Sequence, residues 1–423
     1  MYFSIIDKCK FCLLVIFILC GVLVQCTSEK KSMDEQQKKI QRLFEKELAK
    51  ENIHNAFLAV YSPSAPVNME FIGGTFTNGE AVSAANPFYT ASIGKTFTAT
   101  AIALLCEQGA LQFSDKISNY LHSEIVASLH VFMGNDYSET ITIAQLLQHT
   151  SGLPDYFEGE TIDGSPNVLE LVFSAPDKMW IPKEVLDFSK SKMQPLFAPG
   201  TDYHYTDTEY ILLGLIVEQV SKMTLHDFFR ANFFEPLQMQ HTYMHLRSAP
   251  IEKTARMAEV YASKTDVSAN ISLSADWAGG GIVSTPNDLI KFHHALISGR
   301  IVSATTLKSM QNWVPESRGM EYGFGLRKIA FKKLFPTLPN LTIIGHSGIN
   351  GSFMFYCPEL DTYITGSLNQ TDEVKASVVL MVKVLSEIEK LTVAEDKNIP
   401  LQSSISLNKT KTKKPLNQHF ILL

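Results

Sequence analysis

Cysteine is scarce in the main body of this 423-residue sequence. The chain contains six cysteines, but four of them lie within the first 26 residues. Only Cys106 and Cys357 follow, and each lies in an apolar stretch. The sequence therefore excludes a disulfide framework, and we expect both residues to be small buried hydrophobic side chains.

Glycine, proline and charge of one sign are also limited. The 23 glycines and 18 prolines are too few for a collagen-like or low-complexity chain. The formal net charge of −6 offers no basic face for nucleic-acid phosphates. Hydrophobic residues make up 45% of the chain, which excludes disorder throughout. At about 150 residues per domain, the length allows two or three domain-sized units or one large two-lobed fold.

The longest apolar run lies at the N-terminus. Lys8 and Lys10 precede the almost uninterrupted apolar residues 11–24, and the chain turns polar at Thr27. A charged start followed by about 7–15 apolar residues is typical of a secretory signal, and a spanning helix needs about 20. The sequence therefore predicts export, with an uncleaved membrane anchor as the alternative.

The end of this run resembles a bacterial lipobox. Residues 23–26 are Leu-Val-Gln-Cys, although a small residue usually stands where Gln25 does. We predict a lipoprotein-type signal peptide at residues 1–25 and a lipid on Cys26, which would anchor the protein to the membrane, facing the periplasm. A polar tether is predicted at residues 26–39.

Strand patterns lie at both ends of the remaining chain. Residues 56–61 and 69–76 predict a hairpin. Further strands are predicted at residues 322–329, 341–345, 352–357 and 362–368. We therefore predict an α+β fold (an α/β sandwich), with one antiparallel sheet built from N- and C-terminal strands and flanked by helices.

Helical patterns fill the middle of the chain and close it. Residues 92–108 predict a helix, and Thr142 and Thr285 each begin another with a capping residue. The predicted domain spans residues 40–391, with an inserted mainly helical lobe at roughly 110–280, a last helix at 373–391 and a loosely ordered tail at 392–423. Clefts between two lobes often hold active sites.

Ser92 and Lys95 are the first candidates for chemistry. Positions i and i+3 share a helix face, so the lysine can reach the serine hydroxyl. A lysine in a cleft loses its charge more readily and can take the proton of a serine nucleophile. The Ser-x-x-Lys pattern alone is weak, because it occurs by chance and a helical lysine is usually solvated.

Two further segments carry candidate side chains. Tyr203, Tyr205 and Tyr210 lie before an apolar helix predicted at residues 211–220, and a phenol near cations can relay a proton. Physics alone does not distinguish the three tyrosines. Residues 345–351, Gly-His-Ser-Gly-Ile-Asn-Gly, lie between two predicted strands, where glycines allow a backbone N–H to approach a ligand. The alternatives are a tyrosine packed at the lobe boundary and an ordinary turn with a surface histidine, His346.

The sequence resembles the penicillin-recognising serine hydrolases, whose three motifs it matches in order with Ser92-x-x-Lys95, Tyr205-x-Asp207 and His346-x-Gly348. The resemblance is to the branch with class C β-lactamases, D-alanyl-D-alanine carboxypeptidases, D-aminopeptidases and related esterases. Residues 146–154, 198–201 and 279–286 support it, and it extends from about residue 40 to 390. It implies a β-lactamase/transpeptidase-like fold.

The resemblance also implies roles. Ser92 would be the acylated nucleophile, Lys95 its general base and Tyr205 a partner in proton transfer. The backbone N–H groups of Ser92 and Ile349 would form the oxyanion hole. Substrate would lie along the strand that holds His346 and Gly348. The segment from His149 to Gly152 would be a structural loop without a catalytic role.

Two residues depart from the family pattern. The second motif usually ends in asparagine, whereas Asp207 can accept hydrogen bonds but not donate them. Asp207 could also pair with Lys95 and raise the pKa of the lysine, which would weaken it as a base. His346 replaces the lysine usual in the β-lactamases, and a neutral imidazole holds a carboxylate less firmly.

The resemblance therefore implies an exported serine hydrolase that cleaves an amide or ester bond through a Ser92 acyl-enzyme. Its substrate would be a cell-wall D-peptide, an ester or a β-lactam. A true class C-like β-lactamase and a catalytically lapsed penicillin-binding sensor stay as alternatives. We expect no cofactor, no nucleic-acid partner and no metal, because the sequence has no His-Glu-x-x-His and no paired cysteine spacing. The oligomeric state stays open.

Overall fold

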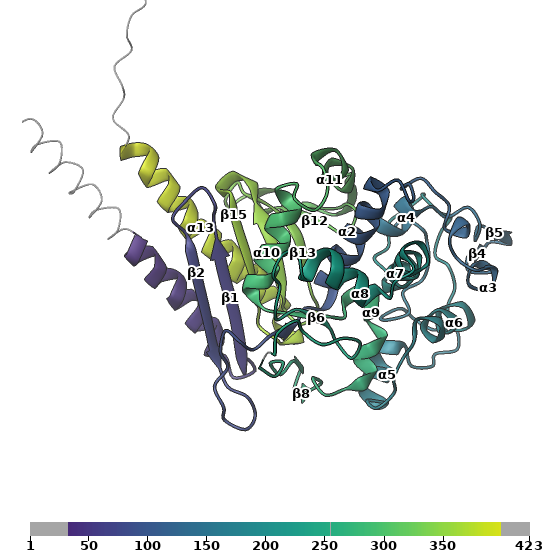
Figure 1. Cartoon of the computed structure of the whole chain (residues 1–423). Coiled ribbons are helices and arrows are strands. Elements are labelled where there is room, and N and C mark those ends of the chain that lie inside the picture. Colours follow the sequence, from purple (N-terminus) through teal and green to yellow (C-terminus); the bar gives the residue numbers. More distant parts are fainter. Residues whose placement is uncertain (1–32, 254, 399–423) are drawn as a thin grey trace, which may run out of the picture.

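The computed structural model describes residues 33–253 and 255–398, in which a large sheet lies beside a mainly helical lobe (Figure 1). The predicted signal peptide at 1–25, Cys26 and residues 399–423 of the predicted tail lie outside the described residues. The last helix, α13 (Val374–Asn398), continues seven residues beyond its predicted end at 391.

Within the described residues, eight antiparallel strands form the main sheet in the order β10-β11-β12-β13-β14-β15-β1-β2. The N-terminal hairpin joins the C-terminal strands because β1 pairs with β15, with Phe57 opposite Ser367. The predicted sheet from both ends of the chain is therefore confirmed. The strands are β1 Asn55–Tyr61, β2 Asn68–Gly74, β10 Val314–Ser317, β11 Met320–Tyr322, β12 Arg327–Ala330, β13 Thr342–Ser347, β14 Phe353–Cys357 and β15 Thr362–Ser367.

Helices cover both faces of the sheet, and β1 is accordingly buried over nearly its whole length. On one face, Leu58 and Val60 share a core with the helix at residues 33–48 and with α13 (Figure 1). Helix α10 (Pro286–Ile297) packs on the opposite face, where the Thr365 hydroxyl donates to its first carbonyl. Burying each leucine or valine side chain contributes about 1.5–3 kcal/mol, so the two layers hold the central strands firmly.

The helical lobe is built around α7, which is buried along most of its length. A helix that is apolar on all sides needs partners on all sides, and α2, α4, α6, α8 and α9 surround it. A small sheet of β3 (Phe88–Tyr89), β9 (Ile282–Ser284) and β6 (Tyr243–Met244) accompanies the lobe. The helices are α2 Gly94–Glu107, α4 Ile143–Leu147, α5 Val168–Ser174, α6 Pro182–Lys192, α7 Asp207–Ser221, α8 Leu225–Phe229 and α9 Trp277–Gly280.

Several predicted boundaries agree with the structure and others differ. Thr142 closes a capping box at the start of α4, and the Thr285 side chain caps α10 as predicted. The single strand predicted at 322–329 is instead two strands, β11 and β12, because the chain turns at residues 323–326, where the Gly323 N–H donates to the Leu326 carbonyl.

The N-terminal helix begins earlier than predicted. Residues 33–39, assigned above to the tether, are helical. Gln36 is buried and its side-chain amide donates to the Glu387 carbonyl of α13 at 3.2 Å, while Met33 packs against the adjoining core. These contacts order the segment although its sequence is polar. No helix in the described ranges has the length and apolar character needed to cross a membrane.

Candidate active site

Ser92 lies on a short 3-10 turn, Ala91–Ile93, directly before α2. Ala91 has φ of +47°, a conformation that costs a non-glycine residue about 1–3 kcal/mol and that turns the chain sharply before the serine. Ser92 is half-buried and lines a cavity of about 570 Å³. Lys95 follows one helical turn later, and its Nζ lies 3.2 Å from Ser92 Oγ. The structure thus brings the two residues of the first motif together at a cavity.

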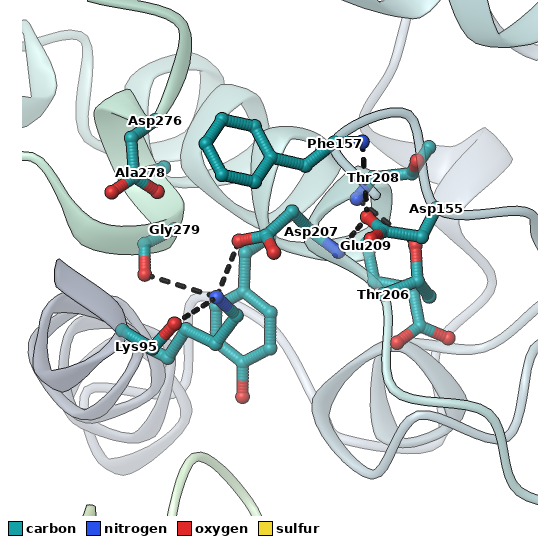
Figure 2. A network of polar contacts seen from close by, with 12 residues as sticks. Lys95, Asp155, Phe157, Thr206, Asp207, Thr208, Glu209, Asp276, Ala278 and Gly279 are labelled. Carbon is teal, nitrogen blue, oxygen red and sulfur yellow. Dashed lines mark hydrogen bonds and ion pairs between the residues drawn. The ribbon is translucent and has the colours of Figure 1, made fainter. Parts of the chain in front are cut away.

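Lys95 is completely buried, and three acceptors surround its ammonium (Figure 2). Nζ donates to Ser92 Oγ, to the Gly279 carbonyl at 3.2 Å and to Asp207 Oδ1. Burial is the largest single effect and lowers the pKa of Lys95, but the charge of Asp207, the smaller effects of Tyr205 and Asp276 and the hydrogen bond to Asp207 together outweigh it, so the pKa lies above the usual value. Lys95 is therefore a paired ammonium at neutral pH in the resting site.

Asp207 reaches Lys95 from the first turn of α7. Thr206 caps this helix, and the Asp207 N–H donates to Asp155 Oδ1 at 2.9 Å. The helix dipole favours a negative charge at this position. Gly279 is required opposite it, because a Cβ at residue 279 would lie 2.5 Å from Asp207 Oδ1. The pairing of Asp207 with Lys95 that the sequence suggested is present.

The structure distinguishes the three candidate tyrosines. Tyr205 lines the cavity, and Lys95 Nζ lies 4.8 Å from the centroid of its ring. Burial raises the pKa of Tyr205 to about 12, with Lys95 opposing the rise, so the phenol is neutral at pH 7. Tyr210 is fully buried and donates to the Leu147 carbonyl. Neither Tyr203 nor Tyr210 is among the described residues that line the cavity.

The third motif approaches Ser92 at the end of β13. Ile349 is 38% exposed and lines the cavity. Gly348 permits the approach, because a Cβ there would lie 2.7 Å from the Thr90 carbonyl oxygen. In the described part of the chain, the backbone N–H groups of Ser92 and Ile349 donate to no other group. Both are therefore available to a ligand oxygen.

His346 does not reach the cavity surface. It is fully buried, and its Nε2 lies 2.9 Å from the Tyr322 hydroxyl. Burial lowers the pKa of His346 well below its usual value, and the nearby charges of Arg327 and Lys95 add to the effect. The imidazole is neutral and supports the neighbouring strand, and its complete burial away from the described lining argues against a direct contact with substrate.

A second buried histidine lies beneath Tyr205. The His149 and Tyr205 rings are 4.4 Å apart between centroids, and His149 Nδ1 lies 2.5 Å from Glu209 Oε2. Both partners are inaccessible to solvent. Burial lowers the pKa of His149 and raises the pKa of Glu209, so a neutral pair is favoured. Neither lines the cavity, in line with a structural loop at His149.

Two buried carboxylates of the site were missed by sequence reasoning. Asp276 lines the cavity and accepts a hydrogen bond from the Tyr89 hydroxyl at 2.9 Å. Asp155 holds the N-terminus of α7 as described above. Burial, together with the charge of Asp207, raises the pKa of both to about 7. The available signal was their position, because each lies within three residues of a family segment, 146–154 or 279–286.

The cavity is acidic at a few points and apolar elsewhere. Its described lining includes three carboxylates, Glu158, Asp207 and Asp276, but no lysine, arginine or histidine. Its apolar walls come from Phe157, Leu169, Val172, Phe173, Val260, Val267 and Leu273. Among the described residues, no group of three or more histidine, cysteine or acidic side chains is arranged to hold a metal ion.

Residues 40–382 match the family model described as Beta-lactamase. Penicillin-binding protein 4* of Bacillus subtilis (strain 168) is 27% identical over 303 residues, which cover 68% of this chain and 62% of that protein. The putative penicillin-binding protein PbpX of the same strain is 30% identical over 240 residues, which cover 56% and 52%. The chain thus spans between half and two thirds of these curated relatives.

Solved structures match over a larger share. D-amino acid amidase from Ochrobactrum anthropi SV3, complexed with L-phenylalanine amide, has a TM-score of 0.69 and 25% identity over 84% of this chain and 99% of that one. A D-stereospecific amidohydrolase from Streptomyces sp. has a TM-score of 0.63 at 24% identity and covers 78% and 94%. The second similarity supports the fold alone.

Proposed function

The chain belongs to the Beta-lactamase family of penicillin-recognising serine hydrolases, and we propose that it cleaves an amide or ester bond through an acyl-enzyme on Ser92. The observation that carries the proposal is the half-buried Ser92 hydroxyl at the cavity, 3.2 Å from Lys95 Nζ. A nucleophile and a base within hydrogen-bonding reach, beside a cavity, form the minimum for acyl transfer.

In the proposed acylation, Lys95 first releases one proton to solvent water, because its ammonium already donates to three acceptors and cannot accept another proton. The neutral amine then takes the proton of Ser92 as Oγ bonds to the substrate carbonyl carbon. The bond from that carbon to the leaving group breaks, and Lys95 returns its proton to the leaving group through Tyr205. Water then attacks the carbonyl carbon of the acyl-enzyme and passes its proton to Lys95. The bond to Ser92 Oγ breaks, the serine regains its proton from Lys95, and the acid is released.

The oxyanion would be held by the free backbone N–H groups of Ser92 and Ile349. Removing one donor of this kind typically costs about 100- to 1,000-fold in rate. His346 and Gly348 would position the strand that carries Ile349. Asp207 would control how readily Lys95 becomes a base.

We favour an amidase or peptidase acting on D-amino-acid derivatives, with esters as a further substrate. The similarity to D-amino acid amidase supports this class. A true β-lactamase is disfavoured because no cation lines the described cavity to hold the β-lactam carboxylate. A lapsed sensor would keep the cavity but not turn over an acyl-enzyme.

A fluorophosphonate probe tests the nucleophile. The wild type and the control variant Ser191→Ala, an exposed serine on α6, should be labelled, whereas Ser92→Ala should not. Equal labelling of Ser92→Ala, or no labelling of the wild type, would overturn the proposal. Hydrolysis of nitrocefin, p-nitrophenyl acetate and D-alanyl-D-alanine peptides would then separate β-lactamase, esterase and peptidase, and labelling without turnover would indicate a sensor.

We also propose that the protein is exported and anchored through a lipid on Cys26. The charged start, the apolar run at residues 11–24 and the lipobox-like end support this. Mass spectrometry of the mature N-terminus should find a lipidated cysteine at residue 26. The Cys26→Ser variant should instead give a soluble product. An intact N-terminus on the membrane-bound protein would favour the uncleaved anchor instead.

A further inference from the structure

We propose that the cavity selects substrates with a free ammonium near the scissile carbonyl, and that Asp276 binds this ammonium. The inference rests on the proposed function and names its substrate class: amides, esters or peptides of an amino acid with an unblocked amino group and an apolar side chain. Substrates that present a carboxylate to the cavity would be disfavoured.

Asp276 is a buried carboxylate with an unused oxygen. The residue is 8% exposed, and Oδ2 accepts from the Tyr89 hydroxyl. Oδ1 accepts no hydrogen bond from the described residues, and the residue lines the cavity. A buried carboxylate oxygen that accepts no hydrogen bond is costly unless a donor or a positive group pairs with it. A substrate ammonium would supply that group.

Lys95 attracts the Asp276 carboxylate through space but donates no hydrogen bond to it. Its three protons are directed to Ser92, Gly279 and Asp207, and Asp276 is not among its acceptors. The two carboxylates nevertheless lie close together. A Cβ placed on Gly279 would be 2.5 Å from Asp207 Oδ1, 3.1 Å from Asp276 Oδ1 and 3.5 Å from Lys95 Nζ. The free oxygen of Asp276 and the Lys95 ammonium therefore both lie within 3.5 Å of the same point at Gly279.

The cations near the third motif are not available for a substrate carboxylate. Arg327 binds Glu316 with two hydrogen bonds, of 2.7 and 2.8 Å. His346 is neutral and bonded to Tyr322, as described above. Neither Arg327 nor His346 is among the described residues that line the cavity. A substrate carboxylate would thus meet three acidic side chains on the described lining, and the Lys95 ammonium beside Ser92 is already paired with Asp207.

The rest of the cavity suits one apolar amino-acid side chain. Phe157, Leu169, Val172 and Leu273 form much of its wall, and its volume of about 570 Å³ falls in the range of sites for small ligands. Glu158 is exposed and also lines the cavity, so it adds a carboxylate to the solvent-accessible part of the lining. Charge and shape together indicate a cationic head group with an apolar side chain.

The test compares two substrates that differ only at the amino group, D-phenylalanine p-nitroanilide and its N-acetyl derivative, at pH 7. The wild type should favour the free amine by about 10- to 100-fold in kcat/KM, the factor expected for a hydrogen bond to a charged partner. Asp276→Asn keeps an acceptor for Tyr89 but loses the charge, and its preference should fall toward one. Asp187→Asn, an exposed acid on α6, is the matched control and should keep the preference.

Two outcomes would overturn the inference: a wild type that prefers the acetylated substrate, or an Asp276→Asn variant that keeps the wild-type ratio. The wild-type ratio of kcat/KM for the free amine to kcat/KM for the acetylated substrate tests the inference even if the Asp276→Asn variant does not fold. Ser92-dependent fluorophosphonate labelling is measured in parallel. If labelling persists without a preference for the amine, only this inference fails; if labelling is absent, the proposed function fails as well.

Discussion

Replacing Asp207 with asparagine should move the pH–rate profile of Ser92 acylation toward lower pH. Lys95 must be neutral to accept the serine proton, and Asp207 is the nearest charge that keeps it protonated. The amide is almost isosteric with the carboxylate and restores the residue usual in this family. The change therefore removes a charge and leaves the packing of α7 in place.

The size of the shift follows from Coulomb's law. Two unit charges about 4 Å apart attract each other by about 4 kcal/mol at an effective dielectric constant of about 20. One pKa unit corresponds to about 1.36 kcal/mol. The limb on which the labelling rate rises as Lys95 loses its proton should therefore move to lower pH by about two to three units. Both groups are nearly inaccessible to solvent, so little of the effect is lost to screening.

Single-turnover labelling by a fluorophosphonate from pH 5.5 to 10 measures this limb directly. Asp187→Asn controls for the lost charge, and thermal melting checks that each variant is folded. If the limbs of Asp207→Asn and the wild type coincide, protonation of Lys95 does not limit acylation and the assignment of Lys95 as the base is wrong. A shift to higher pH would contradict the electrostatic argument itself.

Three further outcomes are expected. Tyr205→Phe should lower kcat for amides by about 100-fold or more but affect p-nitrophenyl esters less, because their leaving group needs no proton; parallel assays of both substrates check this. Gly348→Ala should lower stability by about 1–3 kcal/mol and slow labelling, because the new Cβ meets the Thr90 carbonyl; thermal melting and labelling rates would show neither change if the loop adapts. For the free-amine substrate, kcat/KM should rise through pH 7 as Asp276 ionises, since its pKa is raised to about 7 by burial and by Asp207, while the acetylated substrate lacks this step. The titratable groups that face this carboxylate are Tyr89, Lys95, Tyr156 and Asp207.

Much of the fold could be predicted because its determinants are local in the sequence. Strand patterns at both ends of the chain indicated the shared sheet, and threonines at helix starts marked α4 and α10. The Ser92–Lys95 contact was indicated by the i, i+3 spacing, although Ser92 lies on a 3-10 turn directly before α2. The pairing of Lys95 with Asp207 spans 112 residues, and only the family motifs brought these two positions together.

The electrostatics of the cavity could not be predicted in this way. Asp276 accepts a hydrogen bond from Tyr89, 187 residues away, and its free oxygen matters only because Lys95 is already occupied. His346 belongs to a motif that suggested substrate contact, yet packing turned its ring toward Tyr322. Such outcomes depend on which side chain fills which space in the folded chain, and no periodicity in the sequence records that.

The two proposals meet at the charge of Lys95. The carboxylates that keep this lysine protonated in the free enzyme also attract a cationic substrate, and a bound ammonium beside Asp276 adds a positive charge near Lys95. A like charge lowers the pKa of an amine, so the substrate itself would help Lys95 to become a base. Because kcat/KM reports the free enzyme and kcat the enzyme–substrate complex, the Lys95 limb should lie at lower pH in kcat than in kcat/KM for the free-amine substrate. For the acetylated substrate the two limbs should coincide, and a separation of the same size there would show that the ammonium does not act on Lys95.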